Sequence, residues 1–455
     1  MLNTNSEFLR PEIMDILRLF NAEDEEFTHY FSYGACEYHN CIEYRGQFYD
    51  RLDKQWTEDE LEYKRYAKRF AKLAFYNLLS SAMGIKLPYG ALTGIRPTKL
   101  AYTEIAAGRD FKKLFEECSV SAENISHVQR ILEVQKPYYA NGGGQNLFVS
   151  LPFCPTKCEY CSFITAPISA TEKYVDGYVD CVQREIESVA PFLTNLKSVY
   201  IGGGTPFAIE ARQLERIYAA INALSLKNTE YTVEAGRPDV FTEEKLKLTK
   251  DYGVTRICIN PQSFNDGTLV KIGRKHTCAD VYAAFEMSEK YGFDINVDLI
   301  AGLADEKLAD FENSLKRAIA LKPANITVHT LSLKSGARLK ENCNRLVIDD
   351  IGAMLALSRN MLTAAGYNPY YMYRQKYQAG GHENCGWSLA GKECVYNIDV
   401  MEEIADNVAV GANAISKKLF DNDERIERYA SPKDIPSYIA KVDKIIEERN
   451  KLFGI

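Results

Sequence analysis

From about residue 146 onward, short apolar runs alternate with longer stretches in which apolar residues recur at helical spacing. The short runs are rich in β-branched residues and have the length of buried strands. They cover residues 147–151, 198–201, 231–234, 256–260, 294–300 and 325–330. The amphipathic stretches between them cover residues 172–190, 211–224, 242–252, 278–291 and 308–321.

Six strand–helix alternations over about 190 residues predict a parallel sheet with right-handed crossovers. A complete eight-fold barrel usually needs about 250 residues, so we expect an α/β fold built on a partial (β/α)6 barrel. In such architectures, ligands bind outside the carboxyl ends of the strands. The functional side chains are therefore expected just after the predicted strands.

The regions on either side of this pattern differ from it. Residues 1–140 are rich in aromatic and acidic residues and contain a long helical stretch over residues 57–83. The glycine-rich stretch 141–145 (NGGGQ) indicates a flexible break. We therefore expect an N-terminal α+β domain at 1–140, the barrel at 146–335 and a smaller C-terminal region at 336–455. The last region ends in an amphipathic stretch, 436–453, which predicts one helix.

Composition places the chain among ordinary globular proteins, with 46% hydrophobic and 26% charged residues. The net charge of −7 argues against a general nucleic-acid-binding protein. Charged residues, among them Glu7, Arg10 and Glu12, occupy the N-terminus where a signal peptide needs an apolar run. No stretch approaches the roughly 18 apolar residues of a membrane span. We expect a cytoplasmic protein with no membrane span and no nucleic-acid partner.

Three cysteines, Cys154, Cys158 and Cys161, have the spacing Cys-x3-Cys-x2-Cys directly after the first predicted strand. Three thiolates on one loop can bind three irons of a [4Fe–4S] cluster and leave the fourth iron open to another ligand. The alternative is a structural zinc loop, although such sites usually present four ligands. The sequence therefore predicts a metal site, and the spacing favours an iron–sulfur cluster.

Glycines and polar residues follow the later strands. Residues 202–206 (GGGTP) come after the second strand, where successive glycines allow a ligand to approach the backbone closely. Glu234, Asn260, Gln262 and Asp298 stand at the ends of the third, fourth and fifth strands. Such residues provide acceptors and an amide for a nucleoside, although each is also compatible with a structural role.

The loop that begins at Gly273 carries two basic side chains. Arg274 can pair with a carboxylate through two hydrogen bonds, which makes it a candidate for ligand binding. A single histidine in such a loop is more often a surface residue, so His276 is expected at the surface and receives no role.

The motifs CPTKCEYC, YIGGGTP, VEAGRPD, PQSFND, GRKHT, NVDLIAGL and ITVHTLSLK together resemble the oxygen-independent coproporphyrinogen III oxidase family of radical S-adenosylmethionine (SAM) proteins. The resemblance covers residues 146 to about 416. The segments ALTGIRPTKL and YYMYRQKY are similar to a coproporphyrinogen dehydrogenase branch of Firmicutes that has an extra N-terminal domain. The resemblance implies a partial (β/α)6 barrel, a [4Fe–4S] cluster and one or two SAM molecules. It also implies a tetrapyrrole substrate and a reductant such as flavodoxin or ferredoxin.

The resemblance also implies roles for particular residues. The iron ligands would be Cys154, Cys158 and Cys161. The residues that hold the cluster-bound SAM would be Gly203, Gly204, Thr205 and Glu234. The residues that contact a second SAM or the substrate side would be Tyr160, Gln262, Arg274 and Asp298.

The chain departs from the family at three positions. Well-known oxidases carry a Tyr and a His where this chain has Phe148 and Ser150, and a further Cys where it has Phe163. The resemblance implies anaerobic oxidative decarboxylation of coproporphyrinogen III to protoporphyrinogen IX. The alternatives are a radical enzyme for another tetrapyrrole, such as haem ring opening, and a haem chaperone without catalysis. The His-Asn…Tyr-Trp signature of such chaperones matches residues 382–387 (HENCGW) only distantly.

A tetrapyrrole with four propionates needs basic groups beside an aromatic wall. Residues 370–377 combine Arg374 and Lys376 with four tyrosines, and Arg237 is expected at the barrel mouth. These residues are one hypothesis for substrate contacts, and an aromatic strand with solvated cations is the alternative. Cys385 and Cys394 flank a glycine-containing segment and are a candidate haem or second metal site.

Overall fold

The computed structural model describes the chain apart from residues 95, 162–165, 304, 333–347, 376–378 and 421–424. The described residues form two compact units. The first comprises Met1–Gln129 with Tyr373–Glu383, and the second comprises Arg130–Met372 with Asn384–Ile455. The sequence predicts a different division of the chain into three domains, at residues 1–140, 146–335 and 336–455. That division stays a prediction.

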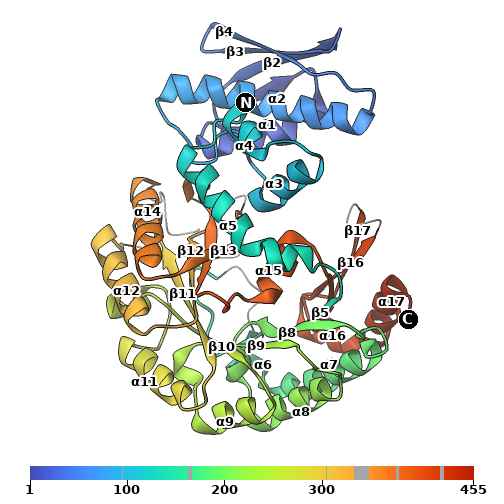
Figure 1. Cartoon of the computed structure of the whole chain (residues 1–455), viewed down its shortest axis with the longest axis vertical. Coiled ribbons are helices and arrows are strands. Elements are labelled where there is room, and N and C mark those ends of the chain that lie inside the picture. Colours follow the sequence, from blue (N-terminus) through green and yellow to red (C-terminus); the bar gives the residue numbers. More distant parts are fainter. Residues whose placement is uncertain (95, 162–165, 304, 333–347, 376–378, 421–424) are drawn as a thin grey trace. The chain divides into compact units, whose positions relative to one another are not determined.

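The first unit has an α+β architecture. Its strands are β1 (Leu2–Thr4), β2 (Phe27–Gly34), β3 (Glu37–Tyr44) and β4 (Gln47–Lys54), paired in that order. Its helices are α1 (Arg10–Leu19), α2 (Glu60–Met83), α3 (Pro97–Ala106), α4 (Phe111–Glu117) and the beginning of α5 (Ala122–Ala140). Along β3 every second residue is buried, because α1 and α2 cover one face of the sheet (Figure 1). The N-terminal α+β domain expected from the sequence is thereby confirmed.

The long helix expected over residues 57–83 is α2. It begins three residues later, since the Asp59 carboxylate accepts hydrogen bonds from the backbone N–H groups of Leu61 and Glu62. It ends at Met83 and is capped by Gly84, which has a φ of 68°.

The second unit contains one large sheet with strand order β13-β14-β12-β11-β10-β9-β8-β5-β15-β16-β17. The six strands expected from the sequence are all present. They are β5 (Gln145–Leu151), β8 (Leu196–Gly203), β9 (Glu230–Gly236), β10 (Arg256–Gln262), β11 (Asp294–Ala301) and β12 (Asn325–Thr330). They pair in sequence order and in parallel, as the partial barrel requires.

The remaining strands extend this sheet on both sides. They are β13 (Asn368–Tyr373), β14 (Asn384–Ser388), β15 (Asp406–Val410), β16 (Ile415–Phe420) and β17 (Arg425–Ala430). The strand β15 lies parallel to β5, whereas β14 lies antiparallel to β12. A seventh parallel strand was not expected, because β15 lies in the C-terminal region.

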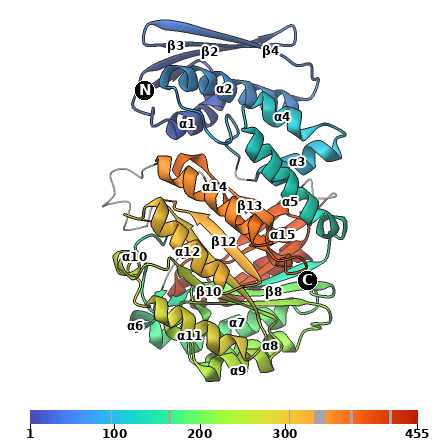
Figure 2. The ribbon, with the colours of Figure 1, turned by 60° about the vertical axis from the view of Figure 1, so that its left-hand side comes forward.

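The crossover helices lie on one face of the parallel strands (Figures 1 and 2). They are α7 (Val175–Val189), α8 (Ala211–Asn222), α9 (Glu243–Asp251), α10 (Asp266–Lys271), α11 (Cys278–Glu289) and α12 (Leu308–Ala320). Two later helices, α14 (Ile348–Ala364) and α15 (Val395–Glu402), follow β12 and β14 in the chain. The aromatic ring of Tyr396, near the start of α15, stacks on Tyr200 of β8 at 4.5 Å. One end of α15 therefore contacts the inner face of the barrel.

The prediction of a single C-terminal helix over residues 436–453 is wrong. The segment forms two helices, α16 (Ile435–Ala440) and α17 (Val442–Phe453), separated at Lys441, where φ is −116°. The physical reason is a shared buried partner. Tyr438 of α16 and Arg449 of α17 both contact the carboxylate of Glu185, and the break between the helices lets both side chains reach it.

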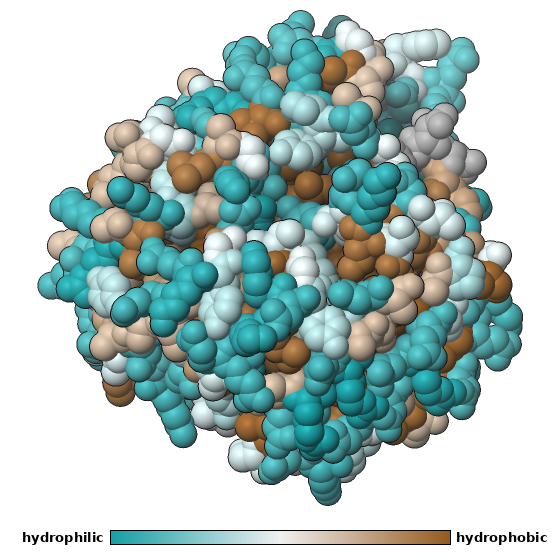
Figure 3. Space-filling view, turned by 60° about the horizontal axis from the view of Figure 1, so that its bottom comes forward, coloured by the Kyte–Doolittle hydropathy of each residue, from teal (hydrophilic) through white to brown (hydrophobic). Residues whose placement is uncertain are grey.

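None of the described helices is both long enough and apolar enough to cross a bilayer. Figure 3 shows the face of the molecule that is lowest in Figure 1. On that face the apolar residues form small patches separated by hydrophilic side chains. This view gives no sign of a large apolar docking surface.

Candidate active site

The cysteine loop begins where β5 ends. Cys154 belongs to the short strand β6 (Phe153–Cys154), and Cys154 and Cys158 are buried while Cys161 is half-buried. Backbone contacts fix this loop onto the segment after β10, since the Glu159 N–H donates to the Ile272 carbonyl at 3.0 Å. The loop is therefore an ordered part of the barrel mouth up to Cys161, after which residues 162–165 lie outside the description.

A buried arginine also holds the loop. Arg237, at the end of β9, makes two hydrogen bonds to Asp239, at 2.9 and 2.6 Å, and a third to the Thr156 hydroxyl. Only 2% of Arg237 is exposed, so its guanidinium is committed to these partners. Arg237 connects the cysteine loop to the third strand, as its expected place at the barrel mouth implied.

The three thiols influence one another electrostatically. Burial raises the pKa of the Cys154 thiol to about 12; a hydrogen bond with Thr205 opposes this shift, and the charges of Cys161 and Cys158 add to it. The Cys154 sulfur lies 3.4 Å from the Thr205 hydroxyl oxygen. Within the described residues, no three His, Cys, Asp or Glu side chains converge closely enough to bind one metal ion.

The glycine segment after β8 packs against the backbone that leads into the cysteine loop. The N–H of Gly204 donates to the Leu151 carbonyl, and the N–H of Thr205 donates to the Phe153 carbonyl, both at 2.8 Å. A Cβ added at Gly204 would lie 2.6 Å from the Phe153 oxygen, while Gly203 has a φ of 102°. Glycine is required here because two backbone segments touch.

This packing predicts the effect of Gly204→Ala. The added methyl group meets three backbone atoms within 2.8 Å, so the cysteine loop has to shift. We expect a loss of about 1–3 kcal/mol of unfolding free energy, together with weaker iron retention. Chemical denaturation and iron analysis measure both. The control is Gly34→Ala, since no atom lies within 4 Å of a Cβ at that position. Equal effects of the two substitutions would contradict this explanation.

Glu234 lies next to the glycine segment, on the inner face at the end of β9. Its Oε2 lies 2.6 Å from the position of a Cβ at Gly202. Burial raises the pKa of Glu234 to about 8; the Asp298 carboxylate adds to the shift, while a hydrogen bond from the Gly203 backbone opposes it. The protein therefore holds a carboxyl group that titrates near neutral pH at this point.

The raised pKa of Glu234 predicts a pH dependence of stability. Between pH 4.5 and about 8 the folded state binds a proton that the unfolded state has lost, so stability falls as pH rises through this window. We expect Glu234→Gln to reduce that fall, so the melting temperatures of the two proteins differ more at pH 8.5 than at pH 5. The control is Glu215→Gln, on the outer helix α8. Parallel curves for wild type and Glu234→Gln would contradict the assignment.

Arg274, Tyr160 and Cys158 form a second group at the barrel mouth. The Arg274 guanidinium donates to the Asn260 carbonyl at 2.5 Å and to the Tyr160 hydroxyl at 2.8 Å. Burial opposes its charge, but Tyr160 and Cys158 outweigh that effect and raise the pKa of Arg274. The side chain therefore remains a cation beside the cysteine loop.

Gln262 ends β10 in an unusual conformation. Its φ is 69°, and the pairing of β10 with β11 shifts register between Ile259 and Gln262. The side chain is 7% exposed, and its Oε1 has no hydrogen-bond partner among the described residues. Left-handed backbone at a non-glycine residue, together with an unpartnered buried oxygen, is typical of ligand sites.

The predicted residues thus lie together at the carboxyl ends of β5, β8, β9, β10 and β11. Thr205 contacts Cys154, Glu234 is close to Gly203 and Asp298, and Arg274 is close to Tyr160 and Cys158. The structure tests only their proximity, and their roles remain a proposal.

Sequence reasoning missed two histidines. His276 is 2% exposed, not at the surface as expected, and neither ring nitrogen makes a well-formed hydrogen bond to a described residue. Burial, with the charge of Arg274, lowers the pKa of His276 to about 4, so the ring is neutral.

His329 of β12 lies on the inner face beside Asp298. The signal in the sequence was its place two residues after Thr327 on the sixth expected strand, because residues two apart in a strand share one face.

The hypothesis that Arg374 contacts the substrate is not supported. Its guanidinium is 6% exposed and donates to the carbonyls of Leu92, Gly94 and Gly381, and it lies 4.4 Å from the centre of the Tyr89 ring. Lys376 and Tyr377, the other part of this hypothesis, lie outside the described residues. Arg374 is therefore a structural residue of the first unit.

This role predicts that Arg374→Ala mainly reduces stability. The substitution leaves buried carbonyls without a donor, which costs on the order of 2–4 kcal/mol. We expect a lower melting temperature and, below that temperature, unchanged binding of SAM and of coproporphyrin III as a probe. A tenfold weaker binding of coproporphyrin III at unchanged stability would restore the substrate hypothesis.

Cys385 and Cys394, the candidate haem or second metal site, contact protein groups that explain their positions. The Cys394 thiol lies 3.2 Å from the Glu230 carboxylate, which also accepts the backbone N–H of Val395 at 3.1 Å. Glu230 therefore caps the start of α15. Cys385 is buried in β14 opposite Val328. These contacts favour packing over a haem or second metal site.

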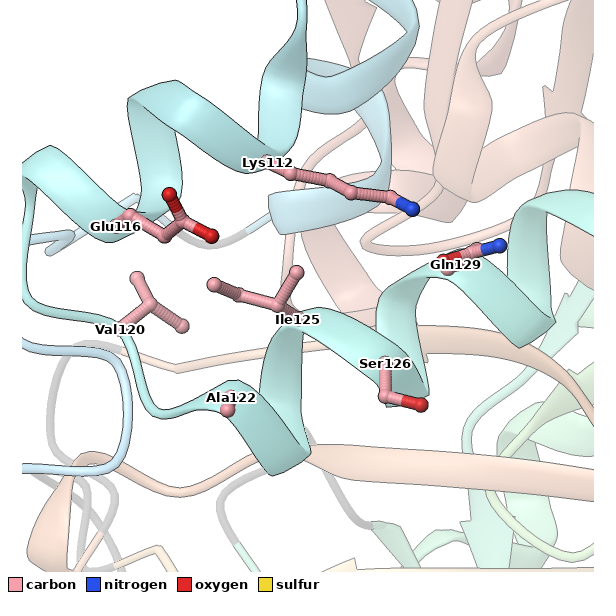
Figure 4. A pocket seen from close by; sticks show the side chains of 7 residues that line it. All are labelled: Lys112, Glu116, Val120, Ala122, Ile125, Ser126 and Gln129. Atoms are coloured by element: carbon pink, nitrogen blue, oxygen red, sulfur yellow. The ribbon is translucent and has the colours of Figure 1, made fainter.

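The first unit contains a surface hollow of about 320 Å³ (Figure 4). It lies between α4 and the start of α5 and is lined by Lys112, Glu116, Val120, Ala122, Ile125, Ser126 and Gln129. None of these residues belongs to the predicted cofactor set.

Comparisons with known proteins agree with this geometry. A sequence profile of the Radical SAM superfamily matches residues 148–318. The chain is 34% identical over 411 residues to the oxygen-independent coproporphyrinogen-III oxidase-like protein HemZ of Bacillus subtilis (strain 168), which covers 86% of this chain and 82% of that protein. It is 32% identical over 275 residues to the heme chaperone HemW of Lactococcus lactis, covering 59% of this chain and 68% of that protein.

Among solved structures, coproporphyrinogen III oxidase (HemN) from Escherichia coli matches with a TM-score of 0.56 and 20% identity, over 68% of this chain and 71% of that chain. This likeness concerns the fold. The fold and the site define a radical SAM protein. Within that superfamily, the chain belongs to the family of oxygen-independent coproporphyrinogen-III oxidase-like proteins, as the motifs predicted.

Proposed function

We propose that this protein catalyses the anaerobic oxidative decarboxylation of coproporphyrinogen III to protoporphyrinogen IX. The observation that carries the proposal is the similarity to the oxidase-like HemZ over 86% of the chain. The geometry of the barrel mouth supports it, because a cysteine loop, a glycine segment and two carboxyl groups meet there.

The residues present fit a [4Fe–4S] cluster and SAM. Three thiols share one loop, and the buried Oε1 of Gln262 has no hydrogen-bond partner among the described residues. Cys154, Cys158 and Cys161 would hold the cluster, and Gly203, Gly204, Thr205 and Glu234 would hold SAM. The residues Tyr160, Gln262, Arg274 and Asp298 would contact a second SAM or the substrate. When bound, the cluster and SAM supply a carbon radical that can take a hydrogen atom from a C–H bond.

The chain's own residues position and enclose the reaction. Arg237 and Arg274 fix the cysteine loop against β9 and β10. The rings of Phe148, Tyr200 and Tyr396 stack on one another. The interplanar angle is 26° between Phe148 and Tyr200, 22° between Tyr200 and Tyr396, and 16° between Phe148 and Tyr396. These three rings form an aromatic surface on the inner face of the barrel, called the aromatic floor below. Burial raises the pKa of Tyr200 and Tyr396 far above its ordinary value, so this floor stays uncharged. An uncharged aromatic surface suits the apolar pyrrole rings of such a substrate and excludes water.

The net change on the substrate is balanced. Each reacting propionate loses one hydrogen atom from its β-carbon, one electron to an acceptor, and carbon dioxide, which leaves a vinyl group. We propose that the protein works in the cytoplasm and receives electrons from a reductant such as flavodoxin or ferredoxin.

A second candidate function is haem binding without catalysis. The similarity to the heme chaperone HemW favours it. The absence of the family's Tyr and His at Phe148 and Ser150 favours instead a radical enzyme with a different substrate. A radical enzyme for another tetrapyrrole, such as haem ring opening, is the third.

One experiment separates these functions. Anaerobically reconstituted protein is given reductant and SAM with either coproporphyrinogen III or haem, and the products are followed by mass spectrometry. Loss of two carbon dioxide units from coproporphyrinogen III supports the proposal. A stable haem complex with both substrates unchanged supports the chaperone and contradicts it. Altered haem with unchanged coproporphyrinogen also contradicts it.

A further inference from the structure

The strand β4 lies at the edge of the four-stranded sheet of the first unit. It pairs with β3 from Lys54 to Gln47 without a register shift, and no other described strand pairs with it. The helices α1 and α2 cover one face of this sheet, and no described helix of the first unit covers the other face (Figures 1 and 2). An edge strand of eight residues that contains no proline is a template for pairing with another strand.

The hydrogen-bond pattern shows which backbone groups of β4 point to the free edge. The N–H of Gln55 donates to the Cys36 carbonyl at 3.0 Å. In the register that this bond continues, the odd-numbered residues of β4 direct their N–H and C=O groups toward β3. The even-numbered residues, from Phe48 to Lys54, direct theirs outward. A second antiparallel strand can therefore form hydrogen bonds only with these even-numbered residues.

Three large apolar side chains on this segment are exposed. Phe48, Leu52 and Trp56 are 67%, 53% and 63% exposed. Trp56 lies two residues beyond the end of β4. The spacing of four residues places all three side chains on the uncovered face of the sheet. A row of exposed apolar side chains along a strand edge indicates an interaction surface.

The charged residues of this strand are complementary to themselves. Residues 50–54 are Asp-Arg-Leu-Asp-Lys, which carry charges of −, +, 0, − and +. A second copy of the strand, running in the opposite direction about Leu52, puts Lys54 opposite Asp50 and Asp53 opposite Arg51. Every charged residue of the stretch then faces a residue of opposite charge, and such cross-strand pairs are stabilising.

The same register also matches the apolar side chains. Phe48 lies opposite Trp56 of the second copy, and Leu52 lies opposite Leu52. The neighbouring registers lack this match, because pairing centred on Asp50 sets two carboxylates against each other. Pairing centred on Arg51 does the same with two guanidinium groups. Like charges directly opposite each other are destabilising, so the pattern favours pairing centred on Leu52.

We propose that two copies of this chain associate through β4, paired antiparallel about Leu52, so that their two sheets form one continuous sheet. Asp50 and Lys54 already contact His39 and Glu37 of their own chain, at 2.8 and 2.7 Å. Their side chains are still 60% and 74% exposed, which leaves them accessible to the second copy. This dimer does not depend on the reaction proposed above.

The test is an exchange of charges, followed by the molecular mass in solution. Sedimentation velocity of the full chain at rising protein concentration gives the dimer Kd of wild type, Asp50→Lys, Lys54→Asp and the double variant. Each single substitution sets like charges against each other at both ends of the strand pair, so we expect it to raise the Kd at least about tenfold. The double variant restores opposite charges and should return the Kd to within about threefold of wild type.

Tryptophan fluorescence follows the strand directly. The chain has two tryptophans, and Trp387 is only 1% exposed, so acrylamide quenches mainly Trp56. We expect quenching of wild type to weaken as the dimer forms, because Phe48 of the second copy covers the indole. The matched control is Asp251→Lys on α9, which changes another exposed aspartate that has an ion-pair partner, Lys247. It should leave the Kd and the quenching unchanged.

Three results would overturn the proposal. Wild type that stays monomeric at every concentration is the first, and it would leave this edge to an extended segment of another protein. The second is a dimer whose Kd the single variants leave unchanged. The third is a double variant that melts as wild type does and yet does not recover the Kd. If a single variant melts at a lower temperature, wild type decides, and quenching that stays constant as the dimer forms contradicts the proposal.

Discussion

Alanine at Cys154, Cys158 or Cys161 is expected to have the largest effect on activity of any single substitution. With two thiolates left, the loop no longer holds three irons, and the chemistry of a radical SAM protein is lost. We expect iron to fall from about four atoms per chain to below about one, and 5′-deoxyadenosine formation to fall at least about a thousandfold. Iron analysis and anaerobic chromatography measure these quantities.

The matched control is Cys181→Ala, which removes another buried thiol, on the outer helix α7. Its iron content and SAM cleavage should equal those of wild type. Alanine variants at the three positions that keep four irons would show that other residues hold the iron and would contradict this prediction.

Arg449→Met is expected to have the largest effect on stability. Arg449 and Glu185 form an ion pair in which both side chains are 0% exposed, and Glu185 also accepts the Gly411 N–H at 2.8 Å. Removing the guanidinium leaves a buried carboxylate without its cation, which costs about 3–5 kcal/mol. Denaturant unfolding of the full chain, followed by far-UV circular dichroism, measures the loss.

An exposed ion pair between the same two helices provides the control. Arg184 of α7 pairs with Asp443 of α17, with side-chain exposures of 50% and 83%. Arg184→Met should cost less than about 1 kcal/mol, because solvent screens this pair. Similar losses for the two variants would mean that the buried pair is not what anchors α17.

The barrel could be predicted from the sequence because its strands are short apolar runs between amphipathic helices. All six expected strands are present, and their bounds differ from the expected ones by two residues at most. The proximity of the candidate cofactor residues could be predicted because parallel strands bring their carboxyl ends to one edge, and Cys154 and Thr205 are indeed in contact.

The rest could not be predicted because it depends on partners distant in the sequence. The break at Lys441 follows from a shared contact with Glu185, which helical periodicity does not reveal. Arg374 was taken for a substrate contact since its neighbours are tyrosines, yet backbone carbonyls of residues 92, 94 and 381 surround it. His276 was expected at the surface, because a loop histidine gives no sign in the sequence of being covered.

The central claim is that this barrel mouth couples SAM cleavage to decarboxylation of a tetrapyrrole. The most direct measurement counts 5′-deoxyadenosine and carbon dioxide in one anaerobic reaction with coproporphyrinogen III, reductant and SAM. The account predicts one 5′-deoxyadenosine for each carbon dioxide and loss of both products in Cys154→Ala. SAM that remains intact in the presence of coproporphyrinogen III, or 5′-deoxyadenosine formed without carbon dioxide, would contradict it.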